Sequence, residues 1–244
     1  MKKFFILIAA SLLAVPSFAI GPVEDPEDES VVNFDVLDHF GFGVHGITPA
    51  ADDANAKQFD SWSKFGYNTE IFFNIVTLSI HPYPTGTILI GADVDWDSYR
   101  IGKNKEGEST YWMLDNNNCI SPVVAHRYSK VNKTHLRVWG FDFPIEFKQK
   151  IGDFSITLGG ALELNMAGTT KFKGVVNTSL GGSEETTLST FKANDIEVNR
   201  FGYHLTAKLQ FFNFGLYAKY NPVPQFDGVN GPKFTTWTVG LIIG

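Results

Sequence analysis

The chain has 244 residues, a formal net charge of −6, 22 Phe residues and a single cysteine. If an N-terminal leader is cleaved, the loss of Lys2 and Lys3 leaves 18 basic against 26 acidic residues and a net charge of −8. Such an acidic balance argues against nucleic acid as a partner. The single cysteine, Cys119, excludes an intrachain disulfide and a metal site built from several cysteines.

The first residues have the pattern of a secretory signal peptide. A basic start at Met1–Lys3 precedes the apolar run Phe4–Val15 and a small-x-small cleavage site at Ser17–Ala19. This apolar run is shorter than the ~20 residues that a transmembrane helix needs. We therefore expect residues 1–19 to be cleaved, and we expect the acidic segment 20–37 to form a solvated N-terminal linker.

Eight segments further along the chain alternate between apolar and polar residues. The most regular is Phe201–Phe211, in which every second residue is apolar and the residues between are small or polar. This period of two is typical of a β-strand with one apolar face and one polar face. The predicted strands are 38–46, 67–78, 88–97, 139–148, 154–166, 201–211, 214–220 and 236–243.

Long and short connections alternate between these strands. Long stretches follow the first, third, fifth and seventh strands, whereas the short connections 81–85, 149–153 and 212–213 follow the second, fourth and sixth. A membrane barrel with both termini in the periplasm needs this alternation of long outer loops and short inner turns. The sequence therefore predicts an all-β fold over residues 38–244: an eight-stranded antiparallel up-and-down transmembrane β-barrel with short periplasmic turns and long extracellular loops. The turn Phe212–Asn213 should place Phe211 opposite Phe214.

A soluble β-sandwich or lipocalin-like barrel also has alternating strands, but its apolar face points to an internal core. Aromatic residues banded by height favour the membrane barrel instead. Threading the strands up and down gives an outer band of Trp96, Trp139, Tyr203, Tyr220 and Trp237 and an inner band of Phe147, Phe154, Phe211 and Phe214. Pro144 lies inside the fourth strand, where it removes a backbone donor, and Pro usually marks an edge strand or a bulge. Its position near the periplasmic end makes a local bulge tolerable.

Two short motifs in the third and fourth strands carry a family resemblance. The run Gly91–Arg100, GADVDWDSYR, and the run Phe143–Glu146, FPIE, are similar to motifs of the PorT-like family of small outer-membrane β-barrels from Bacteroides-type bacteria. The resemblance covers most of the mature chain. It implies the barrel fold and an outer-membrane location, and it assigns no site residues. The chain departs from the family pattern at its end, where Gly244 follows Ile243 in place of an aromatic residue.

The inward faces of the predicted strands carry many charged residues. An eight-stranded barrel is just wide enough to be filled by side chains, so we expect a polar plug rather than a diffusion pore. Buried charges must pair, and Glu146 is expected to bridge to Lys148 or Lys208.

Histidines and carboxylates are predicted to gather at similar height near the outer end of the interior. Such a set could bind a divalent metal or perform acid–base chemistry, whereas a hydrogen-bonded, hydrated core accounts for the same residues without a site. The candidates are His45, Glu70, Asp95, Asp97, Glu163 and His204. Because no motif spacing marks them, we assign no catalytic, metal or cofactor-binding residue and expect no cofactor.

The long loops offer a surface to an extracellular ligand. The stretches 104–133 and 168–199 are rich in Asn, Thr, Lys and Gly and contain aromatic residues that could anchor a partner. These aromatic residues are Tyr111, Trp112, Phe172 and Phe191. We therefore expect an exported, noncatalytic outer-membrane protein, structural or surface-binding, that contacts outer-membrane lipid, the outer-membrane assembly machinery and an unidentified extracellular ligand.

Two alternative functions are left open. An enzyme acting on lipid A or another outer-leaflet lipid would need a nucleophile and a base at the rim, where His126, His135 and Asp115 occur with several serines but without triad spacing. A component of an assembly or secretion machinery could use the acidic run Glu24–Glu29 as a periplasmic contact.

Overall fold

The structure is a computed structural model that describes residues 32–63, 66–115, 119–125, 130–180 and 183–244. The predicted signal peptide and most of the predicted linker lie outside these residues. In the described part, no helix has the length and apolar character needed to cross a lipid bilayer. The elements are β1 Val32–Val36, β2 Phe40–Pro49, α2 Ala54–Trp62, β3 Asn68–Tyr83, β4 Gly86–Tyr99, β5 Thr110–Leu114, β6 Ile120–Val124, β7 Lys130–Ile151, β8 Phe154–Leu180, β9 Ser183–Ile196, β10 Phe201–Phe211, β11 Phe214–Asn221 and β12 Phe234–Ile243.

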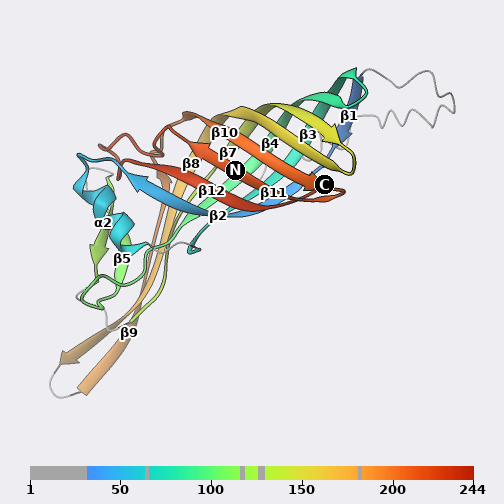
Figure 1. The fold of residues 1–244 in the computed structure, drawn as a ribbon. Helices are drawn as coiled ribbons and strands as arrows, with labels where there is room; N and C mark the ends of the chain where they lie inside the picture. Colours follow the sequence, from blue (N-terminus) through green and yellow to red (C-terminus); the bar gives the residue numbers. More distant parts are fainter. Residues whose placement is uncertain (1–31, 64–65, 116–118, 126–129, 181–182) are drawn as a thin grey trace. The chain divides into compact units, whose positions relative to one another are not determined.

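Eight of these strands close into an antiparallel β-barrel (Figure 1). Their order is β2-β3-β4-β7-β8-β10-β11-β12, and β12 pairs with β2 to close the ring. Each barrel strand pairs with the barrel strands before and after it in the chain, so the connectivity is up-and-down. The predicted fold class and strand number are confirmed. We call the end with the three short connections the turn end and the opposite end the loop end.

The β10–β11 hairpin has the register that its two-residue turn predicts. Phe211 pairs with Phe214, and Lys208 pairs with Tyr217. Phe212 adopts a φ of 51°, the left-handed conformation that tight hairpin turns use. This register decides which side chains face outward, because a slip of one residue would exchange the two faces of the strand.

The outward face of the barrel is an apolar belt. Leucines on three of the barrel strands are more than half exposed on this face: Leu158 and Leu162 on β8, Leu205 on β10 and Leu241 on β12. Contiguous apolar surface of this extent is unfavourable in water, at roughly 25 cal/mol per Å². It matches the lipid-facing band of a transmembrane barrel, in which apolar and polar residues alternate between lipid and lumen.

Aromatic residues mark both margins of this belt, as the sequence predicts. Towards the loop end, Trp96 pairs with Trp139 on the neighbouring strand, and Tyr220 pairs with Trp237. Towards the turn end, the residues Phe147, Phe154, Phe211 and Phe214 are all exposed on the outer face. Aromatic rings concentrate at the two membrane–water interfaces, so these bands delimit the membrane-spanning part of the barrel.

A charge placed on the belt should destabilise the barrel according to its depth. Leu205 lies near the middle of β10 and faces outward, whereas Phe201 is the first residue of the same strand. Leu205→Arg is expected to lower the unfolding free energy by about 2–4 kcal/mol and Phe201→Arg by about 0–1 kcal/mol. Urea unfolding of protein refolded into lipid vesicles measures both. Equal costs for the two variants would contradict the membrane orientation.

The barrel interior is filled by side chains. Phe72 and Tyr217 pack edge to face across it, with ring centroids 5.3 Å apart, and Ile242 joins them in one buried cluster. Glycines on the facing strands make room for the rings. A Cβ at Gly43 would collide with the Tyr217 hydroxyl oxygen, and a Cβ at Gly41 would collide with the Phe72 ring. An aromatic layer therefore adds to the polar plug that the sequence predicts.

Pro144 lies in β7, and the strand accommodates it without a bulge. It pairs with Ala161 on β8, and the register between β7 and β4 is the same before and after it. The missing N–H therefore interrupts the ladder without shifting it. A Cβ at Gly91 on β4 would lie 3.2 Å from the proline ring, so the facing glycine leaves space for that ring.

β1 lies within the segment that the sequence predicts to be a linker, residues 20–37. It pairs antiparallel with the part of β3 that β2 does not cover. Its residues Val32, Phe34 and Val36 alternate with polar residues and are exposed, so they extend the apolar belt next to β3. Leu37, with a φ of 57°, then turns the chain towards β2.

The long connections contain regular structure of their own. The β2–β3 connection forms α2, whose N-cap Asp53 accepts a hydrogen bond from the Ala56 N–H at 2.9 Å. The β4–β7 connection contains the β5–β6 hairpin. Strands β7 and β8 continue beyond the ring, and β9 pairs with β8, so most of the predicted loop 168–199 is strand.

Candidate functional site

The interior of the barrel is strongly acidic. Among the buried side chains that the structure describes there are seven carboxylates but two lysines, Lys208 and Lys219. The buried carboxylates are Glu70, Asp93, Asp95, Asp97, Asp142, Glu146 and Glu163. Even if both buried histidines, His45 and His204, carry a proton, negative charge remains in excess. Buried charges need partners, so the contacts of these groups determine what the interior can do.

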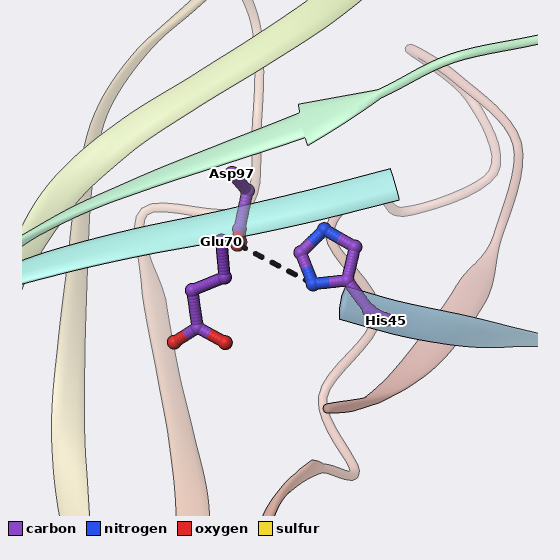
Figure 2. Close-up of side chains that lie close together, drawn as sticks. All are labelled: His45, Glu70 and Asp97. Carbon is purple, nitrogen blue, oxygen red and sulfur yellow. Dashed lines mark ion pairs between the residues drawn. The ribbon is translucent and has the colours of Figure 1, made fainter. Parts of the chain in front are cut away.

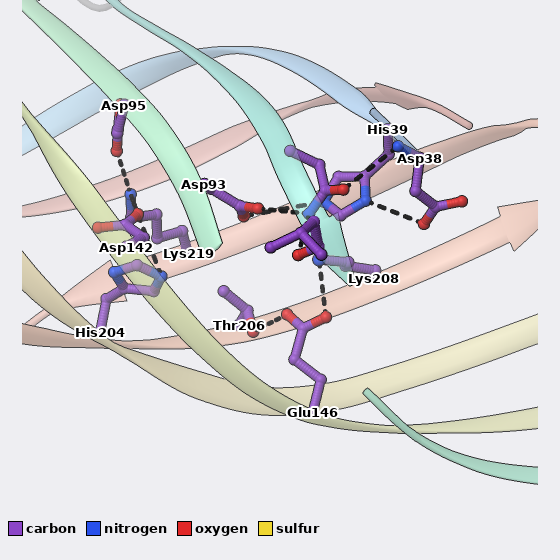
Figure 3. Close-up of polar contacts among 12 residues, drawn as sticks. Asp38, His39, Asp93, Asp95, Asp142, Glu146, His204, Thr206, Lys208 and Lys219 are labelled. Carbon is purple, nitrogen blue, oxygen red and sulfur yellow. Dashed lines mark hydrogen bonds and ion pairs between the residues drawn. The ribbon is translucent and has the colours of Figure 1, made fainter. Parts of the chain in front are cut away.

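Lys219 on β11 ties several strands together. Its Nζ donates to Glu70 Oε1 at 2.8 Å, to Asp95 Oδ2 at 2.7 Å and to Asp142 Oδ2 at 3.2 Å. Figure 3 shows Lys219 between Asp95 and Asp142. Because these three carboxylates come from β3, β4 and β7, one ammonium group compensates charge on three strands besides its own.

A second ion pair lies nearer the turn end. Lys208 Nζ donates to Glu146 Oε2 at 2.7 Å, and Thr206 donates to the other oxygen of that carboxylate at 2.8 Å (Figure 3). The predicted bridge between Glu146 and Lys208 is confirmed. Asp93 accepts a hydrogen bond from the Asn74 side chain at 2.8 Å.

The six predicted lumen candidates are all placed in the interior, and the structure divides five of them between two groups. The first group is His45, Glu70 and Asp97, in which one donor atom of each residue lies within 4.8 Å of the others. His45 Nδ1 is 3.7 Å from Asp97 Oδ1 (Figure 2) and 3.3 Å from the Thr238 hydroxyl. Glu70 and Asp97 are directly opposed on β3 and β4, a pairing of like charges that costs stability unless it is compensated.

The second group is Asp142, Glu163 and His204, again with one donor atom of each within 4.8 Å of the others. Asp142 and Glu163 are directly opposed on β7 and β8, and His204 follows on β10. Asp142 was not among the predicted site candidates. The alternating pattern places it on the inward face, and pairing the fourth and fifth strands in register would have set it opposite Glu163. Asp95, the remaining candidate, is bound to Lys219.

A folded cap lies at the loop end of the barrel. We use this name for α2, β5, β6 and the β11–β12 connection, residues 222–233. Its aromatic core is continuous with the ends of the barrel strands: the Phe59 ring lies 4.9 Å from Trp112 and 5.0 Å from Phe234, between centroids. The buried core consists of Phe59, Trp62, Tyr99, Ile101, Trp112, Ile120, Leu136, Val138, Ile196, Phe226 and Phe234.

This core corrects the prediction that the loop aromatics are surface anchors. Trp112 is fully buried and its Nε1 donates to the Tyr99 carbonyl at 3.2 Å, while Phe172 is 1% exposed. Tyr111 is half-buried, and its ring packs against Phe172 at 4.4 Å between centroids. For Phe191 the structure describes only the backbone, which pairs with Phe172. Trp112 and Phe172 are buried inside the protein, so neither ring is accessible to a partner.

A polar groove of about 460 Å³ opens beside the cap. Asn165 donates through its amide to the Asn199 carbonyl at 2.9 Å and so fixes one wall. On the other side, the Asp227 carboxylate accepts the Val229 and Asn230 backbone N–H groups at 2.8 and 2.9 Å. The lining is Asn165, Met166, Ala167, Ile196, Glu197, Val198, Asn199, Arg200, Asp227 and Asn230. Its volume lies within the range of small-molecule sites.

Cys119 is located between β5 and β6, outside the membrane-spanning strands. Partial burial raises the pKa of its thiol, and the carboxylates of Asp115, Asp53 and Asp227 act in the same direction. We expect a membrane-impermeant maleimide to label it on intact cells slowly at neutral pH. The rate should keep rising with pH beyond about 8.5, where an unperturbed thiol is half ionised. Labelling only after cell lysis would contradict an extracellular cap.

No protein-family model matches the chain, and no curated protein matches it. Among solved structures, it is similar to Ail, the attachment invasion locus protein of Yersinia pestis, with 13% sequence identity and a TM-score of 0.33 over 87% of this chain and 96% of that chain. A structure of Ail with the heparin analogue sucrose octasulfate has 14% identity and a TM-score of 0.29 over the same shares. At these scores the similarity adds nothing to the strand pairing described above, and the PorT-like resemblance stays a prediction.

Proposed function

We propose that this protein is a noncatalytic outer-membrane β-barrel that holds a folded binding surface outside the cell. The observation that carries the proposal is the cap, whose connections form a helix, a hairpin and a shared aromatic core. Ordering these residues costs conformational entropy of about 1–2 kcal/mol for each residue backbone. A barrel needs no such structure merely to cross the membrane.

The filled interior supports a role at the surface rather than in transport. The Phe72–Tyr217 layer and the ion pairs of Lys219 occupy the lumen. Eight-stranded barrels have interiors that side chains fill, whereas diffusion channels are built from 16 or more strands in general porins. We therefore assign the barrel the role of an anchor for the cap.

The groove beside the cap is where we place ligand contact. The groove is lined by polar groups of three kinds. They are the side-chain amides of Asn165, Asn199 and Asn230, the guanidinium group of Arg200 and the carboxylates of Glu197 and Asp227. Amides and charged groups of both signs suit a small ligand with many hydroxyl groups, because each hydroxyl both donates and accepts. The groove thus favours a glycan over an extended apolar ligand.

Binding of nanodisc-embedded protein to a glycan array tests this proposal. The wild type should bind a subset of glycans, and the double variant Arg200→Ala/Asn230→Ala should lose at least about tenfold in affinity, since two polar contacts are removed. Val229→Ala is the matched control, because Val229 is exposed next to the groove without lining it. All three proteins should keep the heat-dependent gel mobility of a folded barrel. Equal binding by wild type and double variant, or no binding by either, would refute the groove as the contact site.

The alternative of an enzyme acting on outer-leaflet lipid makes a different prediction. Of its candidate residues, His126 lies outside the described residues, and Asp115 accepts a hydrogen bond from the Cys119 backbone at 2.9 Å. Mass spectrometry of lipid A from cells with and without the protein separates the two functions. A surface-binding protein leaves the lipid A profile unchanged, whereas an enzyme alters it.

A further inference from the structure

The interior contains a small cavity of about 20 Å³. This volume accommodates one water-sized occupant. Asp142 and His204 line the cavity, together with Glu70, Tyr217 and Lys219. Polar groups from several strands therefore reach the cavity, and the rings of Phe72 and Pro144 complete its lining. Glu163 lies outside this lining, next to Asp142 on the neighbouring strand.

Several of the atoms around this cavity have unmet hydrogen-bonding capacity. Asp142 Oδ1 and His204 Nδ1 have no hydrogen-bond partner among the described residues, and the same is true of Glu70 Oε2 and the Tyr217 hydroxyl. Asp142 is 3% exposed and His204 is 4% exposed, so bulk water does not supply the missing partners. Leaving such groups unsatisfied costs about 1–3 kcal/mol each.

Charge at the cavity distinguishes a cation from a neutral occupant. Asp142 is directly opposed by Glu163 on β8 and by Asp93 on β4. Lys219 contacts only one of these three carboxylates, at Asp142 Oδ2. Glu163 accepts a hydrogen bond from the neutral amide of Asn221 at 3.0 Å, and Asp93 lies 3.8 Å from His39 Nε2. A water molecule would satisfy hydrogen bonds but would add no positive charge to this row, whereas a divalent cation would do both.

We propose that Asp142, Glu163 and His204 bind one divalent transition-metal ion inside the barrel. Their donor atoms lie within 4.8 Å of one another, so side-chain adjustments of a few tenths of an ångström to about 1 Å bring them to bonding distances near 2.0–2.2 Å. One imidazole nitrogen with two carboxylate oxygens suits Zn²⁺ or Mn²⁺ better than Mg²⁺, which favours oxygen ligands and retains its waters. The ion would link β7, β8 and β10.

The ion should enter while the barrel folds. The Phe72–Tyr217 layer and the aromatic core of the cap fill the interior towards its two ends. An ion bound between them is retained after folding, and a chelator added to the folded protein should remove it slowly. The metal must therefore be present in the buffer during refolding if the site is to be filled.

The test uses the full mature chain refolded from urea into detergent after chelator treatment, with Zn²⁺, Mn²⁺, Mg²⁺ or EDTA in the refolding buffer. After gel filtration, elemental analysis should find close to one Zn²⁺ or Mn²⁺ per chain and no stoichiometric Mg²⁺. The temperature at which the gel mobility changes to that of unfolded protein should be higher with bound metal. Absence of stoichiometric Zn²⁺ and Mn²⁺ in the folded wild type would overturn the proposal.

His204→Gln and Glu163→Gln should each reduce metal content at least tenfold at a Zn²⁺ concentration that saturates half of the wild type. The matched control is His45→Gln, since His45 is an equally buried histidine beside two carboxylates in the other group. It should retain the ion. Loss of metal in His45→Gln with retention in His204→Gln would place the ion in the other group and overturn this assignment. If one ligand variant does not refold, the other decides.

Discussion

Replacement of Lys219 by Met is expected to prevent the barrel from folding at neutral pH. The change removes the cation that contacts Glu70, Asp95 and Asp142 and leaves these carboxylates buried. Breaking one buried ion pair by removing a single partner typically costs about 3–5 kcal/mol, and here one residue serves three partners. Whole domains are stable by only about 5–15 kcal/mol. Refolding yield, read from the gel mobility of unboiled protein, measures the effect.

The same variant has two informative controls. Lys150→Met removes an exposed lysine at the turn end and should change stability by no more than about 0.5 kcal/mol. Adding Asp95→Asn and Glu70→Gln to Lys219→Met removes the uncompensated charge, so part of the folding yield should return. Acidic refolding conditions should act in the same direction, because protonated carboxyl groups need no counter-charge. Normal folding of Lys219→Met at neutral pH would show that the network does not stabilise the barrel.

Trp112→Ala is expected to unfold the cap while the barrel stays intact. The indole is fully buried, packs 4.9 Å from the Phe59 ring and donates to the Tyr99 carbonyl. Truncating a buried Trp to Ala typically costs about 3–5 kcal/mol through lost burial and the remaining cavity. Limited proteolysis of protein in nanodiscs should show new cleavage sites in residues 100–125, with the barrel fragment still protected.

Met113→Ala is the matched control, because Met113 follows Trp112 on β5 and is 36% exposed. It should leave the cleavage pattern unchanged. If Trp112→Ala is as resistant to protease as Met113→Ala, the cap is not held together by its aromatic core. Loss of heat-dependent mobility in Trp112→Ala would show instead that cap and barrel fold as one cooperative unit.

The barrel could be predicted because strand alternation and connection length are local properties of the sequence. Phe201–Phe211 shows both faces of its strand without interruption, and its two-residue turn fixes the pairing with the next strand. Each further strand then follows in order, so the fold class, the strand number and the inward charges of the lumen can be derived without three-dimensional information.

The cap and the grouping of the lumen residues depend on contacts between distant segments. Phe59 packs against both Trp112 and Phe234. The three rings come from three different connections or strand ends, and no periodicity relates them. An aromatic pair such as Tyr111 and Trp112 in a long connection suggests a surface anchor as readily as a core element. In the lumen, alternation predicts which residues face inward, but the partner of each charge depends on barrel closure, which brings Lys219 on β11 to Glu70 on β3.

The behaviour of the protein in outer-membrane fractions on gels without boiling tests the central claim most directly. A closed barrel resists detergent at room temperature and is compact, so the unboiled protein should migrate faster than the boiled protein and should stay in the membrane after alkaline carbonate washing. Identical mobility with and without boiling, together with release by carbonate, would contradict a transmembrane β-barrel and, with it, the assignment of the apolar belt to lipid and of the cap to the cell surface.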